Sequence, residues 1–161
     1  MKNVFSLLFF LLISLFCLSI NIIACSCERE APGQGKPPKT QEEKINEQIN
    51  KSDFIFVGKV RKIIEIGNKH SVWGYKIVFE ILMDFKGVDK KRIVLQMNGN
   101  FFCDYEFKKE NEYLIYAFKS NLYDLEGKIL SEFITTNQCT RTNLLKNASK
   151  DIEILNKFYS K

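Results

Sequence analysis

The sequence predicts a small, mainly β domain that is exported and stapled by disulfides. Three observations support this prediction: apolar and polar residues alternate over several segments between residues 54 and 134, an apolar segment stands at the N-terminus, and an even number of cysteines follows it. Alternation with a period of two is the pattern of half-buried strands. Five such segments with turn-rich connections are typical of a small closed barrel or a sandwich.

Residues 1–24 are predicted to be a signal peptide. Lys2 provides a short positive end, and residues 4–23 are nearly all apolar. Ala24 is the small residue that a signal peptidase requires. A retained membrane anchor is the alternative, because the apolar stretch approaches the roughly 20 residues that span a bilayer. We expect cleavage, since the stretch ends sharply and a polar segment follows. Residues 25–161 then form the mature domain, located outside the cell or in a periplasm.

The charge of the chain argues against a nucleic-acid partner. The formal net charge is +5, and loss of Lys2 with the signal peptide lowers it by one. The lysines are scattered between acids, so they are expected to form a solubilising surface. The sequence contains no RNA- or DNA-binding signature, and export argues further against one.

Four cysteines remain once Cys17 has left with the signal peptide. In an oxidising compartment this even number predicts two disulfides. Cys25 and Cys27 flank a single residue, so a bond between them would be strained. Both are therefore expected to reach across the sequence to Cys103 and Cys139, in either pairing. A zinc site is the alternative, but the cysteines lack the short paired spacings that zinc folds use on both sides.

The mature chain is predicted to begin with a loop, a helix and a strand. Residues 28–40 are polar and contain Pro and Gly, which indicates an exposed loop. Ile45 and Ile49 lie four residues apart among charged residues, so residues 41–51 are predicted to form a short helix. The apolar residues of the following strand are expected on one face; they are Phe54, Phe56, Val60, Ile64 and Ile66.

The second strand, which ends at Gly87, has the clearest alternation in the chain. Trp73 is expected to open it and to pack. Its apolar face is predicted to consist of Tyr75, Ile77, Phe79, Ile81, Met83 and Phe85. Its polar face is predicted to contain Lys76, Glu80, Asp84 and Lys86.

Three more strands and a helix complete the domain. Residues 93–97 repeat the alternation, and residues 113–118 are apolar on both faces, which predicts a buried strand. Residues 129–134 form a shorter fifth strand. A terminal helix is expected over residues 151–159. Its apolar face is predicted to consist of Ile152, Leu155, Phe158 and Tyr159.

The sequence offers few residues for catalysis. His70 is the only histidine, and its place beside a turn predicts a solvated loop residue. Without a second histidine or a defined carboxylate pair, neither a metal cluster of its own nor a general acid–base site is indicated. Cysteines held in disulfides supply no thiol nucleophile. The chain is therefore predicted not to be an enzyme and to need no cofactor.

Several segments follow one another in an order that resembles a known family. They are Ala24-Cys25-Ser26-Cys27 at the signal junction, residues 52–58, residues 75–77 with 85–87, Cys103 followed by residues 112–115, and residues 134–136 before Cys139. In this order the chain resembles the N-terminal, netrin-like domain of the tissue inhibitors of metalloproteinases. The match covers most of residues 25–161 and depends on the joint order of the segments rather than on one motif.

The resemblance implies both a fold and a disulfide pairing. The fold would be a five-stranded, OB-like closed barrel with short flanking helices. Cys25 would pair with Cys103, and Cys27 would pair with Cys139.

The resemblance also implies a function at the mature N-terminus. The α-amino nitrogen and the carbonyl oxygen of Cys25 would together ligate the catalytic zinc of a target metalloproteinase. Ser26 would point into the specificity pocket beside the metal. Asn100, Phe101 and Phe102 would form an adjoining ridge, in which the two Phe side chains are either contact surface or core.

The chain departs from the family in ways that keep a second function open. The third disulfide of the family's domain and the C-terminal subdomain of the animal inhibitors have no counterpart here. Residues 22–25 resemble a bacterial lipoprotein box. Lipidation would occupy the sulfur of Cys25 and usually its amine, which would abolish chelation and leave Cys103 unpaired. The alternative is a non-inhibitory binding module, lipid-anchored in the envelope, and contact with a membrane is expected only if Cys25 is lipidated.

Overall fold

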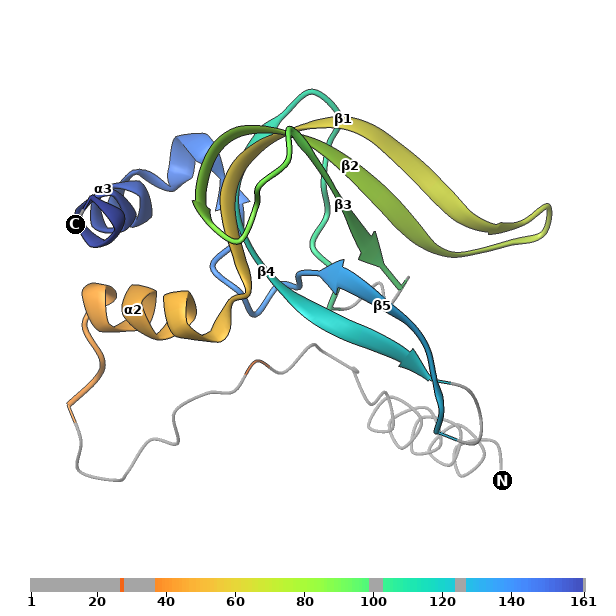
Figure 1. Ribbon diagram of the computed structural model, residues 1–161, viewed down its shortest axis with the longest axis horizontal. Coiled ribbons are helices and arrows are strands. Elements are labelled where there is room, and N and C mark those ends of the chain that lie inside the picture. The colour runs from red at the N-terminus through yellow and green to blue at the C-terminus, as the bar shows by residue number, and fades with distance from the viewer. Residues whose placement is uncertain (1–26, 28–36, 99–102, 124–126, 161) are drawn as a thin grey trace, which may run out of the picture.

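The computed structural model describes residues 27, 37–98, 103–123 and 127–160 (Figure 1). The predicted signal peptide lies outside these residues. The described elements are α2 (Gln41–Lys51), β1 (Phe54–Asn68), β2 (Ser71–Lys86), β3 (Arg92–Met97), β4 (Glu112–Tyr123), β5 (Ile129–Thr135), β6 (Asn143–Leu144), the 3-10 helix η1 (Leu145–Asn147) and α3 (Ser149–Tyr159). No described helix has the length and apolar character that crossing a bilayer requires.

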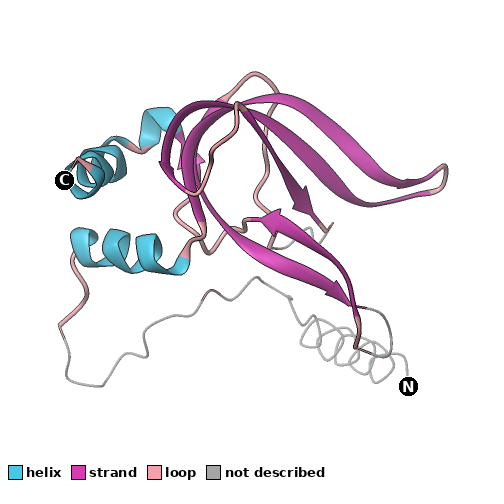
Figure 2. Cartoon of the chain, in the orientation of Figure 1, coloured by secondary structure: helices cyan, strands magenta, loops and turns pink. Residues whose placement is uncertain are grey.

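The protein is mainly β, with six antiparallel strands and two described α-helices beside them (Figure 2). The strand order is β3-β2-β1-β4-β5, and β6 pairs with β4. Residues 112–117 of β4 pair with β1, whereas residues 118–123 pair with β5. The strand therefore changes partners midway along its length.

This topology contradicts the predicted closed barrel. Among the described residues no ladder joins β3 to β5, so the sheet stays open. The two edges meet where the hydroxyl of Thr135 lies 3.9 Å from the sulfur of Met97. In the described ladders β5 is paired with the second half of β4 and β3, of six residues, is paired with β2.

Two apolar cores lie on opposite faces of β1 and β4. Phe56 and Val60 of β1 point into the first core, while Ile55 and Val57 point into the second, which α2 and α3 cover. Residues 113–117 of β4 are buried on both faces, as the sequence predicts for this strand. Its alternate side chains enter each core: Tyr113, Ile115 and Ala117 the first, Leu114 and Tyr116 the second.

Helix α2 forms over the residues that the sequence predicts, and both of its ends are capped. Thr40 accepts a hydrogen bond from the backbone N–H of Glu43, whose carboxylate accepts one from the N–H of Thr40. At the other end the Lys86 ammonium donates to the carbonyl oxygens of Ile49, at 3.0 Å, and Ser52, at 2.5 Å. A strand thus supplies the cation that the helix C-terminus favours.

Two β-bulges change the predicted faces of β1 and β2. Val60 lies opposite Phe79 but Lys62 lies opposite Val78, so one extra residue of β1 shifts the alternation. As a result Ile64 is 38% exposed instead of facing the core. A second bulge places one extra residue of β2 before Met83, which is 45% exposed. Periodicity read from the sequence has no means of locating such insertions.

Helix α3 buries only part of the predicted face: Leu155 is fully buried and Ile152 packs against the second core. Its buried residues are Asp151, Ile154 and Leu155, whereas Phe158 is 49% exposed. Tyr159 is 37% exposed. The buried side also includes Asp151, which lies outside the predicted apolar face and whose carboxylate is bonded inside the protein.

The ends of β1 and β2 project from the body as a hairpin arm, defined here as residues 61–76 (Figure 1). At its tip His70 is exposed, as predicted, and its N–H donates to the side chain of Asn68. Trp73 is also exposed on this arm, at 56%, so the prediction that it packs is wrong. It is the extra residue of a further register shift, between Gly67 and Ile66 of the partner strand.

Candidate functional site

Residue 27 is joined covalently to the C-terminal part of the domain. Cys27 is bonded to Cys139 across 112 residues, as the family resemblance implies. A chain-entropy treatment credits a loop of this length with roughly 4–5 kcal/mol of stabilisation. The bond fixes residue 27 beside the turn that follows β5.

Cys103 lies next to Cys139, although the two are far apart in sequence. The backbone N–H of Gln138 donates to the carbonyl oxygen of Cys103 at 2.9 Å, and its side-chain amide donates to that of Asp104 at 3.2 Å. Cys103 is itself disulfide-bonded. Its predicted partner, Cys25, lies outside the described residues, so that pairing stays a prediction. The two cysteines expected to bond the N-terminal pair are therefore neighbours in space.

A side-chain turn orients Cys139 for its bond. The amide oxygen of Asn137 accepts hydrogen bonds from the backbone N–H groups of Cys139, at 2.9 Å, and Thr140, at 3.2 Å. Asn commonly forms such turns because its short side chain reaches the backbone two residues on. The local sequence thus presents the cysteine at the surface in a fixed direction.

Three threonines attach the residues around Cys139 to β4. The hydroxyl of Thr136 lies 2.8 Å from that of Thr140 and 2.9 Å from that of Thr142. Thr136 donates to the carbonyl oxygen of Tyr116 at 2.8 Å, and Thr142 accepts from its N–H at 3.0 Å. Thr136 and Thr142 are buried, and every buried polar side chain in the described part of the protein has a partner.

A buried carboxylate connects this segment to α3. Arg141 donates two parallel hydrogen bonds to Asp151, from Nε at 2.7 Å and from its terminal nitrogen at 2.8 Å. The hydroxyl of Tyr116 donates to the same carboxylate at 3.0 Å. Burial, together with the neighbouring charge of Asp151, raises the pKa of Tyr116 well above its ordinary value. The hydrogen bond to Asp151 also raises the pKa of Arg141.

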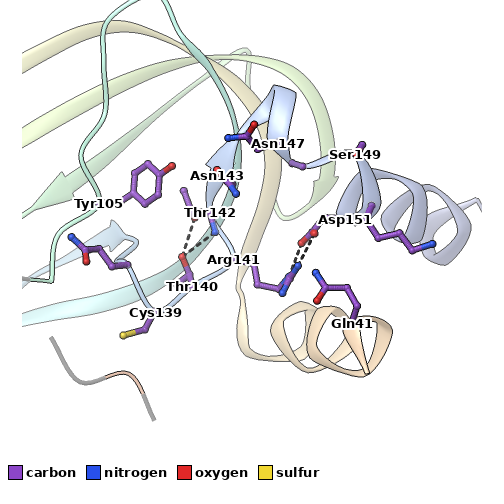
Figure 3. Close-up of a pocket in the computed structure, with 13 residues that line it drawn as sticks. Gln41, Tyr105, Cys139, Thr140, Arg141, Thr142, Asn143, Asn147, Ser149 and Asp151 are labelled. Atoms are coloured by element: carbon purple, nitrogen blue, oxygen red, sulfur yellow. Dashed lines mark hydrogen bonds and ion pairs between the residues drawn. The ribbon is translucent and has the colours of Figure 1, made fainter. Parts of the chain in front are cut away.

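A polar cavity of about 590 Å³ opens beside these groups (Figure 3). Figure 3 shows Arg141 and Asp151 pointing toward each other, with Thr140 and Thr142 nearby. These four groups bond one another in pairs. The described residues also hold no group of three potential metal ligands. The arrangement supports a rigid scaffold around the disulfide.

The residues predicted to contact a protease are not placed by the structure. Cys25, Ser26 and residues 100–102, which include Asn100, Phe101 and Phe102, lie outside the described residues. Their anchoring points, Cys27 and Cys103, are described and lie on the same side of the domain as Cys139.

The sequence analysis missed the network formed by Arg141, Asp151 and the threonines. One signal was present: residues 140–142 read Thr-Arg-Thr, a polar run directly after a cysteine. A second was Asp151, an acid at the start of an amphipathic helix. Neither signal identifies its partner, because the segment at residues 140–142 and α3 are separate elements that meet only in the fold.

Ionisation of Tyr116 predicts a loss of stability in alkali. In the unfolded chain a tyrosine ionises near pH 10. Its pKa in the folded protein is higher, so its contribution is complete below about pH 10 and is lost as pH rises above that value. Urea unfolding at pH 9 and 11 should show a larger fall for the unaltered protein than for Tyr116→Phe. Tyr105 and Tyr159 titrate in both proteins, so equal falls would contradict the assignment to Tyr116.

No protein-family model and no curated protein sequence matches the chain.

Proposed function

We propose that the chain is a secreted, netrin-like inhibitor of metalloproteinases that chelates the protease zinc through Cys25. The observation that supports this most is the disulfide from Cys27 to Cys139, with the disulfide-bonded Cys103 beside it. A chain that starts at Cys25 would begin two residues before a fixed point. Its α-amino group would then be held close to the body of the domain.

The chemistry of this terminus suits a zinc ligand. A catalytic zinc in a protease keeps one coordination position open, normally filled by water. The α-amino nitrogen and carbonyl oxygen of Cys25 would fill it as a chelate. The amine must be neutral to bind, and its free pKa is near ~8, so zinc has to displace a proton at a modest cost at neutral pH. Ser26 would extend into the adjacent specificity pocket.

The scaffold around the disulfide favours inhibition over catalysis. Cys139 is fixed by the turn at Asn137, by the threonine hydroxyls and by the ion pair between Arg141 and Asp151. An inhibitor benefits from such rigidity, because an ordered contact segment loses less conformational entropy on binding. The same groups bond one another and leave no acid–base pair to act on a substrate.

One inserted residue tests the chelation directly. Adding one Ala before Cys25 moves the free amine by about 3.8 Å and turns the Cys25 nitrogen into an amide, a poor zinc ligand. Inhibition of a susceptible metalloproteinase should vanish, while urea unfolding stays unchanged because no core residue is altered. Undiminished inhibition by the extended protein would refute chelation.

Intact mass measurement of the exported protein separates this function from the alternative. A free Cys25 that forms a disulfide gives the mass of residues 25–161 with its cysteines oxidised. A lipid adduct on Cys25 would exclude chelation and would favour an envelope-anchored, non-inhibitory binding module.

A further inference from the structure

The side of β1, β2 and β3 that faces away from the first core forms a surface of its own. Residues directly opposite in antiparallel strands share a face. Lys62 lies opposite Val78, which lies opposite Val94. In the next row Lys76 lies between Ile64 of β1 and Gln96 of β3. The neighbours of Lys76 along β2 point inward into the first core. We call this surface the outer face; its members are Lys62, Ile64, Ile66, Lys76, Val78, Val94 and Gln96.

The outer face combines exposed apolar side chains with cations. Ile64 is 38% exposed and Val94 is 46% exposed, and both lie beside the exposed Lys62 and Lys76. Further out along the hairpin arm Trp73 exposes 56% of its surface. Exposed apolar side chains thus occur together with cations in this region.

The cations of this region lack counterions among the described residues. Lys62 and Lys76 form no ion pair there, and neither does Lys69 at the tip of the arm. By contrast, Arg61 bonds two carboxylates, one of which is the nearby Glu80. The outer face and the tip therefore present positive charge that nothing in the described part of the chain neutralises.

The remaining acid of the arm lies on the other side of the hairpin. Glu65 is opposite Tyr75, which packs against the first core, so it does not share the face of Lys62 and Lys76. Glu65 is thus on the opposite side of the sheet from Lys62 and Lys76, while Glu80, two residues beyond Val78 on β2, is bonded to Arg61. This segregation contrasts with the mixed charges expected from the sequence.

We propose that the outer face and the hairpin arm dock onto an anionic lipid surface. Trp73 lies at the level of the headgroups, where its ring is partly apolar and its N–H remains hydrated. Lys62, Lys69 and Lys76 meet the lipid phosphates. This docking is independent of any lipid on Cys25 and of protease inhibition.

The apolar residues favour a lipid surface over an acidic polysaccharide. A sulfated sugar chain would neutralise the lysines but would leave Ile64 and Val94 largely in water. A bilayer interface accommodates both, because anionic headgroups and buried acyl carbons lie within a few ångströms of each other. Trp73 lies on the hairpin arm, which projects from the body of the domain (Figure 1), and its exposed ring can reach such a surface.

Trp73 makes the test direct, because it is the only tryptophan in the chain. The exported protein is titrated with phosphatidylcholine vesicles, with and without phosphatidylglycerol. Its emission should shift to shorter wavelength only with the anionic vesicles. About 0.5 M salt should reverse the shift, because it screens the attraction. A lipid anchor on Cys25 would bind both vesicle types but would not move Trp73 from water by itself.

Two double variants locate the binding surface. Lys62→Gln with Lys76→Gln should weaken the titration about 30-fold, the expected effect of two cations near an anionic bilayer. Lys44→Gln with Lys157→Gln removes the same charge from exposed positions on α2 and α3, and its titration should stay within about threefold of the unaltered protein. Urea unfolding of all three proteins confirms that the fold is intact.

Several results would overturn the proposal. One is an emission spectrum on anionic vesicles identical to that in buffer, and another is an equal shift on neutral vesicles. Equal weakening by the two double variants would show that only net charge matters. A shift with a heparin fragment and none with vesicles would identify an acidic polysaccharide as the ligand instead.

Discussion

Replacing Phe79 by alanine is expected to lower the free energy of unfolding by about 3–5 kcal/mol. The ring is fully buried in the first core. It makes edge-to-face contacts with Phe56, at 5.8 Å between centroids, and with Phe107, at 5.1 Å. These rings come from different segments, so no single movement closes the cavity that truncation leaves. Denaturant unfolding measures the change.

Glu80→Ala is the matched control for this substitution. Glu80 is the next residue of β2, and it points away from the core toward Arg61. Both side chains of that ion pair are more than 40% exposed, so its loss should cost under about 0.5 kcal/mol. Equal costs for the two substitutions would show that the register of β2 is wrong.

Removing the carboxylate of Asp151 is expected to cost about 3 kcal/mol or more. Asp151→Ala leaves the buried hydroxyl of Tyr116 and the half-buried Arg141 without their acceptor. Breaking a buried pair from one side is strongly destabilising, because the remaining charge has lost its compensation. Denaturant unfolding at pH 7 measures the loss.

Two further variants separate the ion pair from simple truncation of α3. Glu153→Ala removes an exposed acid of the same helix, whose partner Lys150 is also exposed, and should cost under about 0.5 kcal/mol. Asp151→Asn keeps the shape and one acceptor oxygen and should fall between the two. A cost for Asp151→Ala as small as that for Glu153→Ala would mean that the network contributes little to stability.

The sequence predicted the elements of the fold well, because each depends on local pattern. Ile45 and Ile49 identified α2, and the unbroken apolar run at residues 113–118 identified the strand buried on both faces. Closure of the barrel failed as a prediction, because it depends on how far β5 follows β4 relative to the edge of β3. Strand count and alternation contain no information about whether β5 pairs with β3.

The candidate site was predicted less completely. The family resemblance implied the Cys27–Cys139 bond, which the structure contains. The ion pair of Arg141 with Asp151 and the exposure of Trp73 were not anticipated. Both depend on relations between distant residues: a pairing across ten positions in one case, and a register shift between two strands in the other.

The bond from Cys27 to Cys139 also determines how the protein bears mechanical load. Tension applied between residue 27 and the C-terminal end of α3 passes from Cys27 through the sulfur bridge to Cys139, and so bypasses the strands β1 to β5 within the loop. Of the described elements, β6, η1 and α3 lie on the stretched path beyond the bridge. Pulling on the oxidised protein should therefore extend the short C-terminal segment alone. The main sheet should unravel under force only after the bridge has been reduced.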